Sequence, residues 1–291
     1  MDGIIIVNKP KQYTSNDIVN IVKKKLNTKV GHTGTLDPNA TGVLPLLLGV
    51  GTKFSKYLIN HDKKYVATIK LGEKTSTADS EGDIIETKNV DMAALKNEAV
   101  EKVLKTFVGK QTQIPPVYSA IKVNGKKLYE YARSGKVVDI PKRTIEIYKI
   151  KLVNLDENKR EIIFEVECSK GTYIRTLCED IAAKIGTVGY MKELNRVRVG
   201  LFNIESAVSI EDIENNKDNE QWLKENIIGL EEVLNNNPKY TIQSQEEFNR
   251  FLNGVKLMVS VPDGLYRIYF ENELIGSGVC SNSQLKRDVI L

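Results

Sequence analysis

The stretch from residue 31 to residue 45 reads GHTGTLDPNATGVLP and is the most unusual part of this 291-residue sequence. It holds three glycines, three threonines, one of only two histidines and the aspartate Asp37. Pro38 disfavours a helical backbone at Asp37, and glycine lets a chain turn sharply or approach a ligand closely. We therefore expect a loop that presents the Asp37 carboxylate into a cleft. The alternative is that Asp37 only stabilises a turn, the common role of aspartate before proline.

The glycines near this aspartate suggest a phosphate-binding loop as another alternative. Gly31 and Gly34 are separated by two residues, and residues 49–53 read GVGTK. Neither spacing matches GxxxxGK followed by Ser or Thr, or GxGxxG. Nucleotide hydrolysis is therefore weakly supported.

Outward from the loop, helical and β-type patterns are mixed along the chain. Apolar residues at helical spacing predict helices, and alternating or β-branched runs predict strands. The expected helices span residues 15–26, 91–108, 172–185 and 245–252, and the expected strands span residues 3–7, 64–71, 144–155, 161–168 and 193–202. Because the elements do not alternate regularly as βαβ units, we predict an α+β fold.

The composition is that of a globular protein with a basic and an acidic part. Hydrophobic residues make up 41% and charged residues 27%, which fits neither a disordered nor a membrane chain. Residues 1–204 hold 34 Lys and Arg against 23 Asp and Glu, or +11, and residues 205–291 hold 8 against 15, or −7. The basic part suggests a polyanionic partner, although lysines that merely solvate a surface would give the same count.

The remaining composition bears on compartment and cofactors. The N-terminus does not resemble a signal peptide and no segment has a membrane-spanning length, so we expect a cytoplasmic protein without a membrane partner. Three cysteines without CxxC spacing are read as free, packing thiols. With two histidines, the chain lacks the ligands of an ordinary zinc site, so we expect no metal and no cofactor.

Domain organisation is predicted from the same patterns. Pro238 is taken as the boundary between a domain of residues 1–237 and a compact β-rich module of residues 238–291. Residues 110–143 form an expected excursion, with a turn at residues 123–125 and a short basic helix at residues 126–133.

Several strings, taken in order, carry a resemblance to a known family. The stretch 31–45, NKP at 8–10 and SKGTYIRTL at 169–177 resemble the TruB family of tRNA pseudouridine synthases. Further matching strings are TKF at 52–54, KY at 64–65, LG at 71–72, TAD at 77–79, IPPVYSAIK at 114–122 and GKKLY at 125–129. The similarity covers residues 3–204.

The resemblance implies a fold and an activity. The fold would be a mixed, mainly antiparallel central sheet flanked by helices, followed by a PUA-like C-terminal module whose match is weaker. The activity would be isomerisation of uridine-55 in the TΨC loop of tRNA to pseudouridine, with the target base flipped out of the RNA. The partner would be tRNA, and we expect a monomer.

The resemblance also implies the catalytic residues. Asp37 would be the catalytic carboxylate, and Arg175 would lie against it, where a fixed cation keeps a desolvated carboxylate ionised. Tyr65 would stack on the flipped uracil with its hydroxyl near the centre that loses a proton late in the reaction. Without their flanking strings, Arg175 would read as a surface charge and Tyr65 as ordinary packing.

Further substrate-binding positions follow from the same resemblance. Tyr173 would be a second tyrosine of the pocket, and His32 would hold the extruded nucleotide. The other matching positions are Lys9, Lys53, Asp79 and Leu194. Their alternatives are a strand end, a surface charge, a turn cap and plain core, respectively.

The excursion at residues 110–143 has the composition of an RNA grip. Its cations are Lys110, Lys122, Lys126, Lys127, Arg133, Lys136, Lys142 and Arg143, and tyrosines lie among them. Cations suit phosphates and aromatic rings suit bases, so Lys126 and Lys127 are expected to bind RNA. The alternative is an exposed hairpin and helix without a ligand.

Two other functions remain open at this level. One is a guide-dependent relative that modifies ribosomal RNA within a ribonucleoprotein, which the short C-terminal part and the lack of an extended basic tail disfavour. The other is a non-catalytic RNA-binding or RNA-folding protein, which the presence of Asp37, Tyr65 and Arg175 disfavours.

Overall fold

The computed structural model describes residues 1–58, 61–93, 95–119, 121–135 and 138–291, without the side chains of residues 129, 132 and 133. Lys136 and the side chain of Arg133, both expected in the RNA grip, therefore lie outside the described residues.

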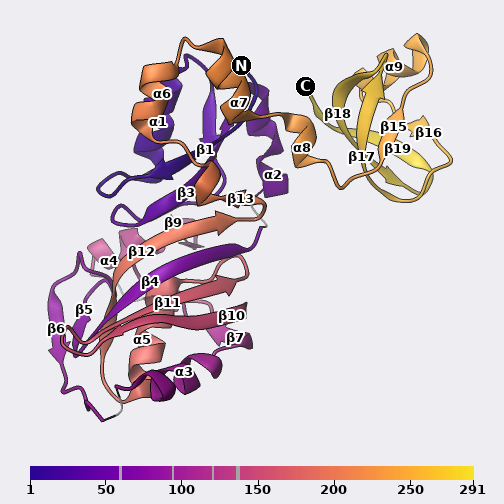
Figure 1. Ribbon diagram of the computed structural model, residues 1–291. Helices are drawn as coiled ribbons and strands as arrows, with labels where there is room; N and C mark the ends of the chain where they lie inside the picture. Colours follow the sequence, from indigo (N-terminus) through magenta and orange to yellow (C-terminus); the bar gives the residue numbers. More distant parts are fainter. Residues whose placement is uncertain (59–60, 94, 120, 136–137) are drawn as a thin grey trace.

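The main sheet is mixed and mainly antiparallel, as predicted (Figure 1). Its strands, in spatial order, are β14 (Ile227–Ile228), β1 (Gly3–Lys9), β3 (Thr41–Leu48), β12 (Gly189–Val199), β4 (Lys63–Leu71), β11 (Glu161–Cys168), β10 (Arg143–Asp156) and β7 (Gly109–Gln113). β2 (Val30–His32) pairs with β3, and β13 (Phe202–Asn203) pairs with β12. We call β14, β1, β3 and β2 the first half-sheet, and the strands from β12 to β7 the second half-sheet.

Helix α1 (Ser15–Lys25) covers the first half-sheet together with α6 (Ile210–Asn216) and α7 (Glu220–Asn226). α1 begins where Thr14 and Asp17 form a reciprocal capping box, which satisfies backbone donors of the first turn. Its apolar face packs Ile18 and Val22 against the sheet, where both are fully buried. Burial of such a side chain stabilises the fold by about 1.5–3 kcal/mol.

Helices α3 (Asn97–Lys105) and α5 (Ile174–Ile185) cover one face of the second half-sheet (Figure 1). α5 ends at Gly186, whose φ of 100° gives the left-handed cap that glycine adopts without strain. α3 is shorter than predicted from the apolar pattern at residues 91–108. Gly109 does not cap it, because the helix already ends at Thr106 and Gly109 opens β7.

The two half-sheets meet at a short parallel pairing, which we call the seam. There Asn195 lies opposite Thr41 and Arg196 opposite Gly42. Gly42 has a φ of 105°, and a Cβ atom on it would lie 2.2 Å from the carbonyl oxygen of Arg196. The close approach of the two strands therefore requires glycine at this position. Residues 33–40, which we call the Asp37 loop, connect β2 to β3 at the seam.

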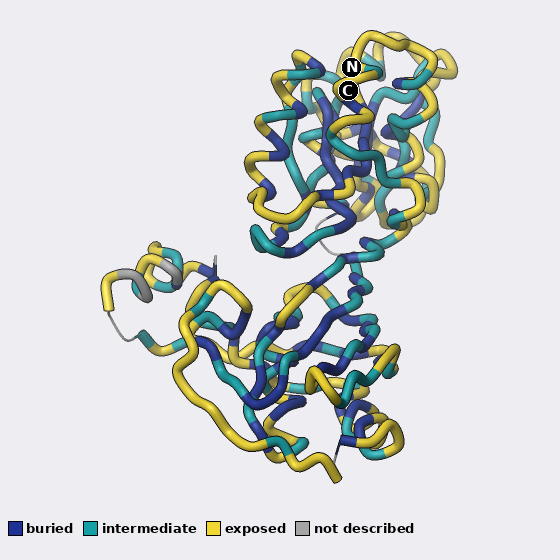
Figure 2. Tube along the Cα trace, turned by 60° about the vertical axis from the view of Figure 1, so that its left-hand side comes forward, coloured by how far each residue is buried: buried dark blue, intermediate teal, exposed yellow. Residues whose placement is uncertain are grey.

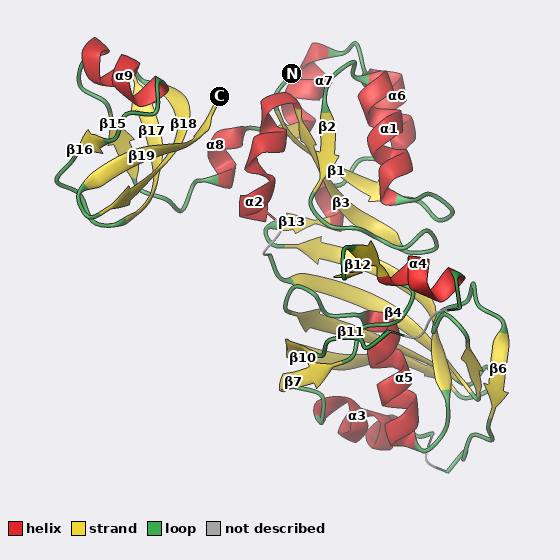
Figure 3. Cartoon of the chain, turned by 180° about the vertical axis from the view of Figure 1, so that it is seen from behind, coloured by secondary structure: helices red, strands yellow, loops and turns green. Residues whose placement is uncertain are grey.

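Two small hairpins project from the second half-sheet. β5 (Glu73–Thr75) pairs with β6 (Ile84–Thr87), and β8 (Lys122–Val123) pairs with β9 (Lys126–Lys127). The predicted turn between β8 and β9 is confirmed, since Asn124 and Gly125 both have positive φ. The helix α4 (Leu128–Arg133) follows β9 and lies in front of the sheet beside β12 in Figure 3.

The C-terminal residues form a β-rich module with a core of its own, as predicted. Its five strands, in spatial order, are β15 (Lys239–Thr241), β17 (Gly264–Phe270), β18 (Glu273–Ser281), β19 (Gln284–Ile290) and β16 (Leu257–Met258), and α9 (Gln245–Leu252) packs on them. In Figure 2, buried stretches of the chain lie toward the inside of the molecule and exposed stretches gather at its outside. The exact boundary at Pro238 remains a prediction.

The module is docked on η1 (Gly49–Phe54), α2 (Ser55–Leu58) and α8 (Leu230–Val233). Phe54 and Val289 share a small apolar cluster there, and the Tyr57 hydroxyl donates to the Asp288 carboxylate. Within the described ranges, no helix has the length and apolar composition to cross a membrane.

Candidate active site

A cavity of about 700 Å³ lies at the seam, and most of the predicted pocket residues line it. Its walls come from the Asp37 loop, β4, β12 and the start of α5. Asp37, Tyr65, Tyr173, Arg175 and Leu194, which lie as far apart as 157 positions in the chain (194 − 37), are all in its lining. A cavity of this size can receive a nucleotide-sized ligand.

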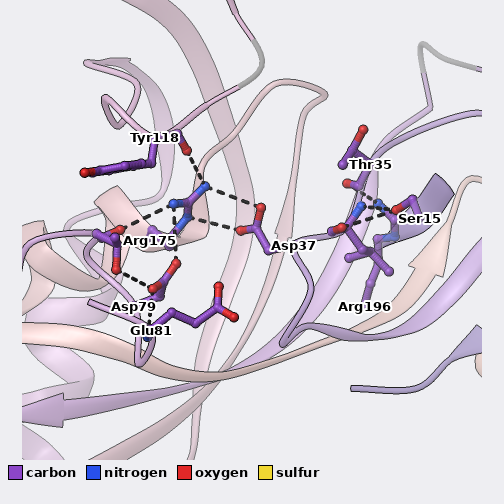
Figure 4. Close-up of polar contacts among 10 residues, drawn as sticks. Ser15, Thr35, Asp37, Asp79, Glu81, Tyr118, Arg175 and Arg196 are labelled. Atoms are coloured by element: carbon purple, nitrogen blue, oxygen red, sulfur yellow. Dashed lines mark hydrogen bonds and ion pairs between the residues drawn. The ribbon is translucent and has the colours of Figure 1, made fainter. Parts of the chain in front are cut away.

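Asp37 and Arg175 form a two-point ion pair in this cavity (Figure 4). Arg175 Nε lies 3.1 Å from Asp37 Oδ2, and Arg175 Nη2 lies 3.4 Å from Asp37 Oδ1. The Asp37 carbonyl accepts a bond from the Ala40 amide and so closes a turn, while the carboxylate is left to face Arg175. The turn and the presented carboxylate, which the sequence offers as alternatives, therefore coexist.

Arg175 is fixed from several other sides. Its Nη1 lies 3.4 Å from Asp79 Oδ2, and its Nη2 donates to the Tyr118 carbonyl at 2.9 Å (Figure 4). The Arg175 side chain is only 7% exposed. A buried guanidinium held between two carboxylates and a carbonyl has one orientation, so it fixes the position of the Asp37 carboxylate.

The electrostatic environment of Asp37 combines opposing effects. Burial raises the pKa of Asp37 above its ordinary value, and the neighbouring Asp79 raises it further. Arg175 lowers the pKa of Asp37, as the sequence predicts, and Lys9 and Arg196 add smaller effects in the same direction. Because burial is the larger effect, the net pKa of this carboxyl is raised rather than held at its usual value.

The two tyrosines of the cavity lining come from different elements of the fold. Tyr65 on β4 is 8% exposed, and burial raises the pKa of its hydroxyl to about 12. Tyr173 precedes α5, and its backbone amide and carbonyl both bond to the side chain of Gln113 on β7. Leu194 on β12 adds an apolar surface that is 8% exposed. These groups provide aromatic and apolar walls around the carboxylate.

The other predicted residues lie outside the cavity lining: Lys9, His32, Lys53, Asp79, Lys126 and Lys127. Lys9 is fully buried beneath the Asp37 loop, and its ammonium donates to the carbonyls of Pro10, Tyr13 and Pro38 at 2.7–2.9 Å. Burial lowers the pKa of Lys9 to about 8. This position suits support of the loop rather than a direct phosphate contact. Lys53 donates to the Ile290 carbonyl at 2.7 Å and so lies at the C-terminal module.

His32 and the insertion lysines complete the predicted set. His32 ends β2, directly before the Asp37 loop, and its Nδ1 accepts from the Gly34 amide at 3.3 Å. Burial lowers the pKa of His32. Lys126 and Lys127 lie on β9 of the insertion, with Lys126 exposed and Lys127 half-buried.

Two residues near Asp37 were not predicted. Glu81, just after Asp79, is a third carboxyl group near Arg175, and burial and both aspartates raise its pKa. Arg196 lines the cavity from β12 and is 2% exposed. The signal for Arg196 was its place two residues after Leu194, on the buried face of an alternating strand, where a charge is out of pattern.

The described part of the chain holds no group of three or more His, Cys, Asp or Glu residues arranged to bind a metal ion. Cys168, Cys178 and Cys280 are buried free thiols.

The fold itself matches those of solved structures of larger complexes. One is titled as an H/ACA RNP bound to a substrate RNA containing 2′-deoxyuridine; it aligns with 99% of this chain and 85% of its own, at a TM-score of 0.71 and 24% identity. Another is a Cbf5-Nop10-Gar1 complex, aligned over 99% of this chain and 83% of its own, at a TM-score of 0.70 and 26% identity. The chain therefore shares the fold of these structures.

Sequence comparison identifies the family. Residues 20–174 match the TruB family pseudouridylate synthase N-terminal domain, and residues 175–235 match the tRNA pseudouridylate synthase B C-terminal domain. Relatives named tRNA pseudouridine synthase B include those of Clostridium kluyveri, 42% identical over 98% of both chains, and Clostridium tetani, 43% identical over 96% of this chain and 95% of its own. The chain belongs to the TruB family and is an isomerase.

Proposed function

We propose that this enzyme isomerises uridine-55 in the TΨC loop of tRNA to pseudouridine, with Asp37 as the catalytic carboxylate. The observation that carries the proposal is the Asp37 carboxylate itself, which lies in a nucleotide-sized cavity and is held by Arg175 at 3.1 Å. The printed name of the relatives, tRNA pseudouridine synthase B, supports tRNA as the substrate.

The reaction exchanges one bond to the ribose for another. The C1′–N1 bond breaks, the uracil turns, a C1′–C5 bond forms, the proton on C5 leaves and N1 gains a proton. Atoms and electrons balance without a cofactor or an energy source. Asp37 must be ionised, whether it adds to C6 of the base or assists cleavage of the glycosidic bond. The fixed guanidinium of Arg175 favours that ionised form.

The cavity walls suit a base that has left its stack. A base inside a folded RNA loop must be extruded before chemistry, at a cost of a few kcal/mol. In this proposal Tyr65 stacks on the uracil, Tyr173 and Leu194 close the pocket, and His32 holds the extruded nucleotide from the start of the Asp37 loop. Asp79 acts through Arg175, which it contacts at 3.4 Å.

RNA binding outside the cavity is assigned to the insertion at residues 110–143. Lys126 is exposed on β9, and the following helix α4 lies beside β12 in Figure 3. We place the phosphate contacts at Lys126 and Lys127. Residues 1–237 form the catalytic domain in this proposal, residues 238–291 form the PUA-like module, and the active unit is a monomer.

The test uses purified protein and an unmodified tRNA transcript tritiated at C5 of uridine. We expect release of about one equivalent of tritium per tRNA, and no release from a transcript that carries cytidine at position 55. Asp37→Asn is expected to lower the single-turnover rate by roughly 10³-fold or more while tRNA affinity survives. The exposed Asp218→Asn is the matched control.

The outcomes separate the competing functions. Near-normal turnover by Asp37→Asn contradicts the mechanism. Tight tRNA binding without tritium release from the wild-type enzyme favours a non-catalytic RNA-binding protein, or a synthase that requires a guide RNA.

A further inference from the structure

Arg196 is a charged side chain in an unusual place. It lies in the middle of β12 at the seam and is 2% exposed, among the largest fully buried side chains of the protein. Its guanidinium donates to three backbone carbonyls, those of Val43 at 2.8 Å, Gly34 at 3.1 Å and Thr35 at 3.4 Å. Thr35 and the Arg196 guanidinium are drawn together in Figure 4.

These acceptors lie on both sides of the catalytic aspartate. Gly34 and Thr35 precede Asp37 in the Asp37 loop, and Val43 follows the loop on β3. The two loop contacts span 162 and 161 positions in the sequence. Arg196 therefore ties both ends of the loop to β12, a strand of the other half-sheet.

Arg196 also lies beside Tyr65, the pocket tyrosine on β4. It is paired with Tyr65 in the register of β12 and β4, and both side chains line the cavity. Tyr65 and the loop that carries Asp37 thus share one rigid guanidinium as a neighbour. The planar fork of arginine has a fixed geometry that a lysine ammonium cannot reproduce.

Burial of this charge is costly. Within the described residues, no Asp or Glu oxygen lies within ion-pair distance of Arg196. A buried cation without a carboxylate partner stabilises a fold less well than an apolar side chain of similar volume would. Stability alone does not account for an arginine here.

We infer that Arg196 is a positioning residue for the isomerisation, which holds the Asp37 loop and Tyr65 in one frame so that carboxylate and stacking ring meet the same uracil. The inference rests on the proposed function. A displacement of about 1 Å in such a constellation costs on the order of 100-fold in rate.

The test compares two variants of Arg196 with two of Arg198, which lies two residues further along the same strand. Arg198 is half-buried, pairs with Glu167, donates to the Gly200 carbonyl and lies outside the cavity lining. Arg196→Lys keeps the charge and loses the fork; Arg196→Gln loses both. Arg198→Lys and Arg198→Gln are the matched controls. Single-turnover rates are normalised to the fraction of enzyme that binds tRNA, and thermal unfolding is recorded for each protein.

We expect both Arg196 variants to lose on the order of 100-fold in single-turnover rate, with tRNA affinity within about threefold and both controls near the wild type. A wild-type rate in Arg196→Lys overturns the inference. So does unfolding of both Arg196 variants, which would make the residue one of stability only. A wild-type enzyme that releases no tritium fails the proposed function instead.

A pH profile gives a readout that a merely structural role would not move. Asp37 is faced by Arg175, Asp79, Lys9 and Arg196, of which the three cations lower its pKa. Loss of the charge in Arg196→Gln is expected to shift the acidic limb of the rate to higher pH, while Arg196→Lys leaves the limb closer to that of the wild type. If the acidic limb of the rate lies at the same pH in both variants and in the wild type, the inference that Arg196 positions Asp37 is contradicted.

Discussion

Two polar, glycine-bearing segments of the molecule, the Asp37 loop and the insertion tip, are held in different ways. The Asp37 loop is fixed at five of its eight residues, 34–38, by groups from elsewhere in the fold. Arg196 binds its start, Ser15 accepts from the Leu36 amide at 2.8 Å and donates to the Leu36 carbonyl, and Lys9 binds the Pro38 carbonyl. The insertion tip, residues 122–134, is closed by bonds of its own, such as that from the Tyr131 hydroxyl to the Val123 carbonyl.

The difference matches the functions that we propose for the two segments. A catalytic carboxylate gains rate from being held in one position before the substrate arrives. A segment that grips a folded RNA gains from charge and reach, which do not require a buried framework. We expect changes at the loop to act on the rate, and changes at the tip to act on affinity.

The largest effect is expected at the ion pair that fixes the loop's carboxylate. Arg175→Met leaves Asp37 and Asp79 without their shared cation, so the Asp37 carboxylate is neither fixed in position nor favoured in its ionised form, and we expect a loss of roughly 10²–10⁴ in rate. The measurement is single-turnover tritium release beside tRNA affinity, with the exposed Arg250→Met on α9 as control. A loss of affinity equal to the loss of rate would break the distinction between loop and tip.

A smaller effect is expected at the seam. Gly42→Ala places a Cβ atom 2.2 Å from the Arg196 carbonyl oxygen at a φ of 105°, so the strands must separate. We expect a loss of about 2–3 kcal/mol in the free energy of unfolding, together with a reduced rate. Gly31→Ala is the control, because its Cβ atom would lie 3.7 Å from Thr52 in ordinary contact. Thermal unfolding measures the difference, and equal unfolding temperatures contradict the prediction.

The insertion tip should respond in affinity alone. In Lys126→Ala/Lys127→Ala, each lost phosphate contact lowers tRNA affinity and reduces the slope of log affinity against log salt by about 1. The rate at saturating tRNA should stay unchanged. Lys102→Ala, exposed on α3, serves as control. If the rate at saturating tRNA changes while the slope of log affinity against log salt does not, these lysines act on the rate, as the Asp37 loop does, and the prediction is contradicted.

The smallest effect is a shift in pH dependence. Because the pKa of Asp37 is raised, the rate should fall on acidification at a pH above that of an ordinary aspartate. Asp79→Asn removes a charge that raises this pKa, so the acidic limb should move to lower pH. Single-turnover rates across pH measure the limb, with Asp218→Asn as control, and a limb that moves to higher pH is the contrary outcome.

Stability should depend on pH in the opposite sense to rate. A carboxyl group whose pKa is higher in the folded than in the unfolded protein stabilises the fold at low pH, and that contribution is lost as the pH rises through the folded value. Wild-type enzyme should therefore show a loss of unfolding free energy over this range that is missing in Asp37→Asn.

Local patterns in the sequence predicted the fold well where one element carries its own signal. The capping residues Thr14 and Asp17 and the helix at residues 245–252 are found as expected. The predicted helix at residues 91–108 is longer than α3, because Leu95 and Phe107, which extend the apolar spacing, are buried in the core outside the two ends of the helix.

The site could be predicted only through resemblance, and only in part. Tertiary contacts decide that Lys9 lies beneath the loop and Lys53 at the C-terminal module, and neither side chain carries a local sign of this. Arg196 was missed because its partners are main-chain carbonyls, which have no letter in the sequence. Its only trace was a charge on the buried face of an otherwise apolar alternation.

The contacts of Arg196 and Lys9 with main-chain carbonyls limit how the site can be moved to another protein. The bonds from Arg196 and Lys9 do not depend on which side chains the loop carries, so the shape of residues 33–40 is encoded outside them, as far as 162 positions away. A designer who grafted GHTGTLDPNATGVLP onto a foreign scaffold would transfer the aspartate and leave its geometry behind. A functional graft has to bring the supporting arginine, lysine and serine with it, each at its own depth beneath the new surface.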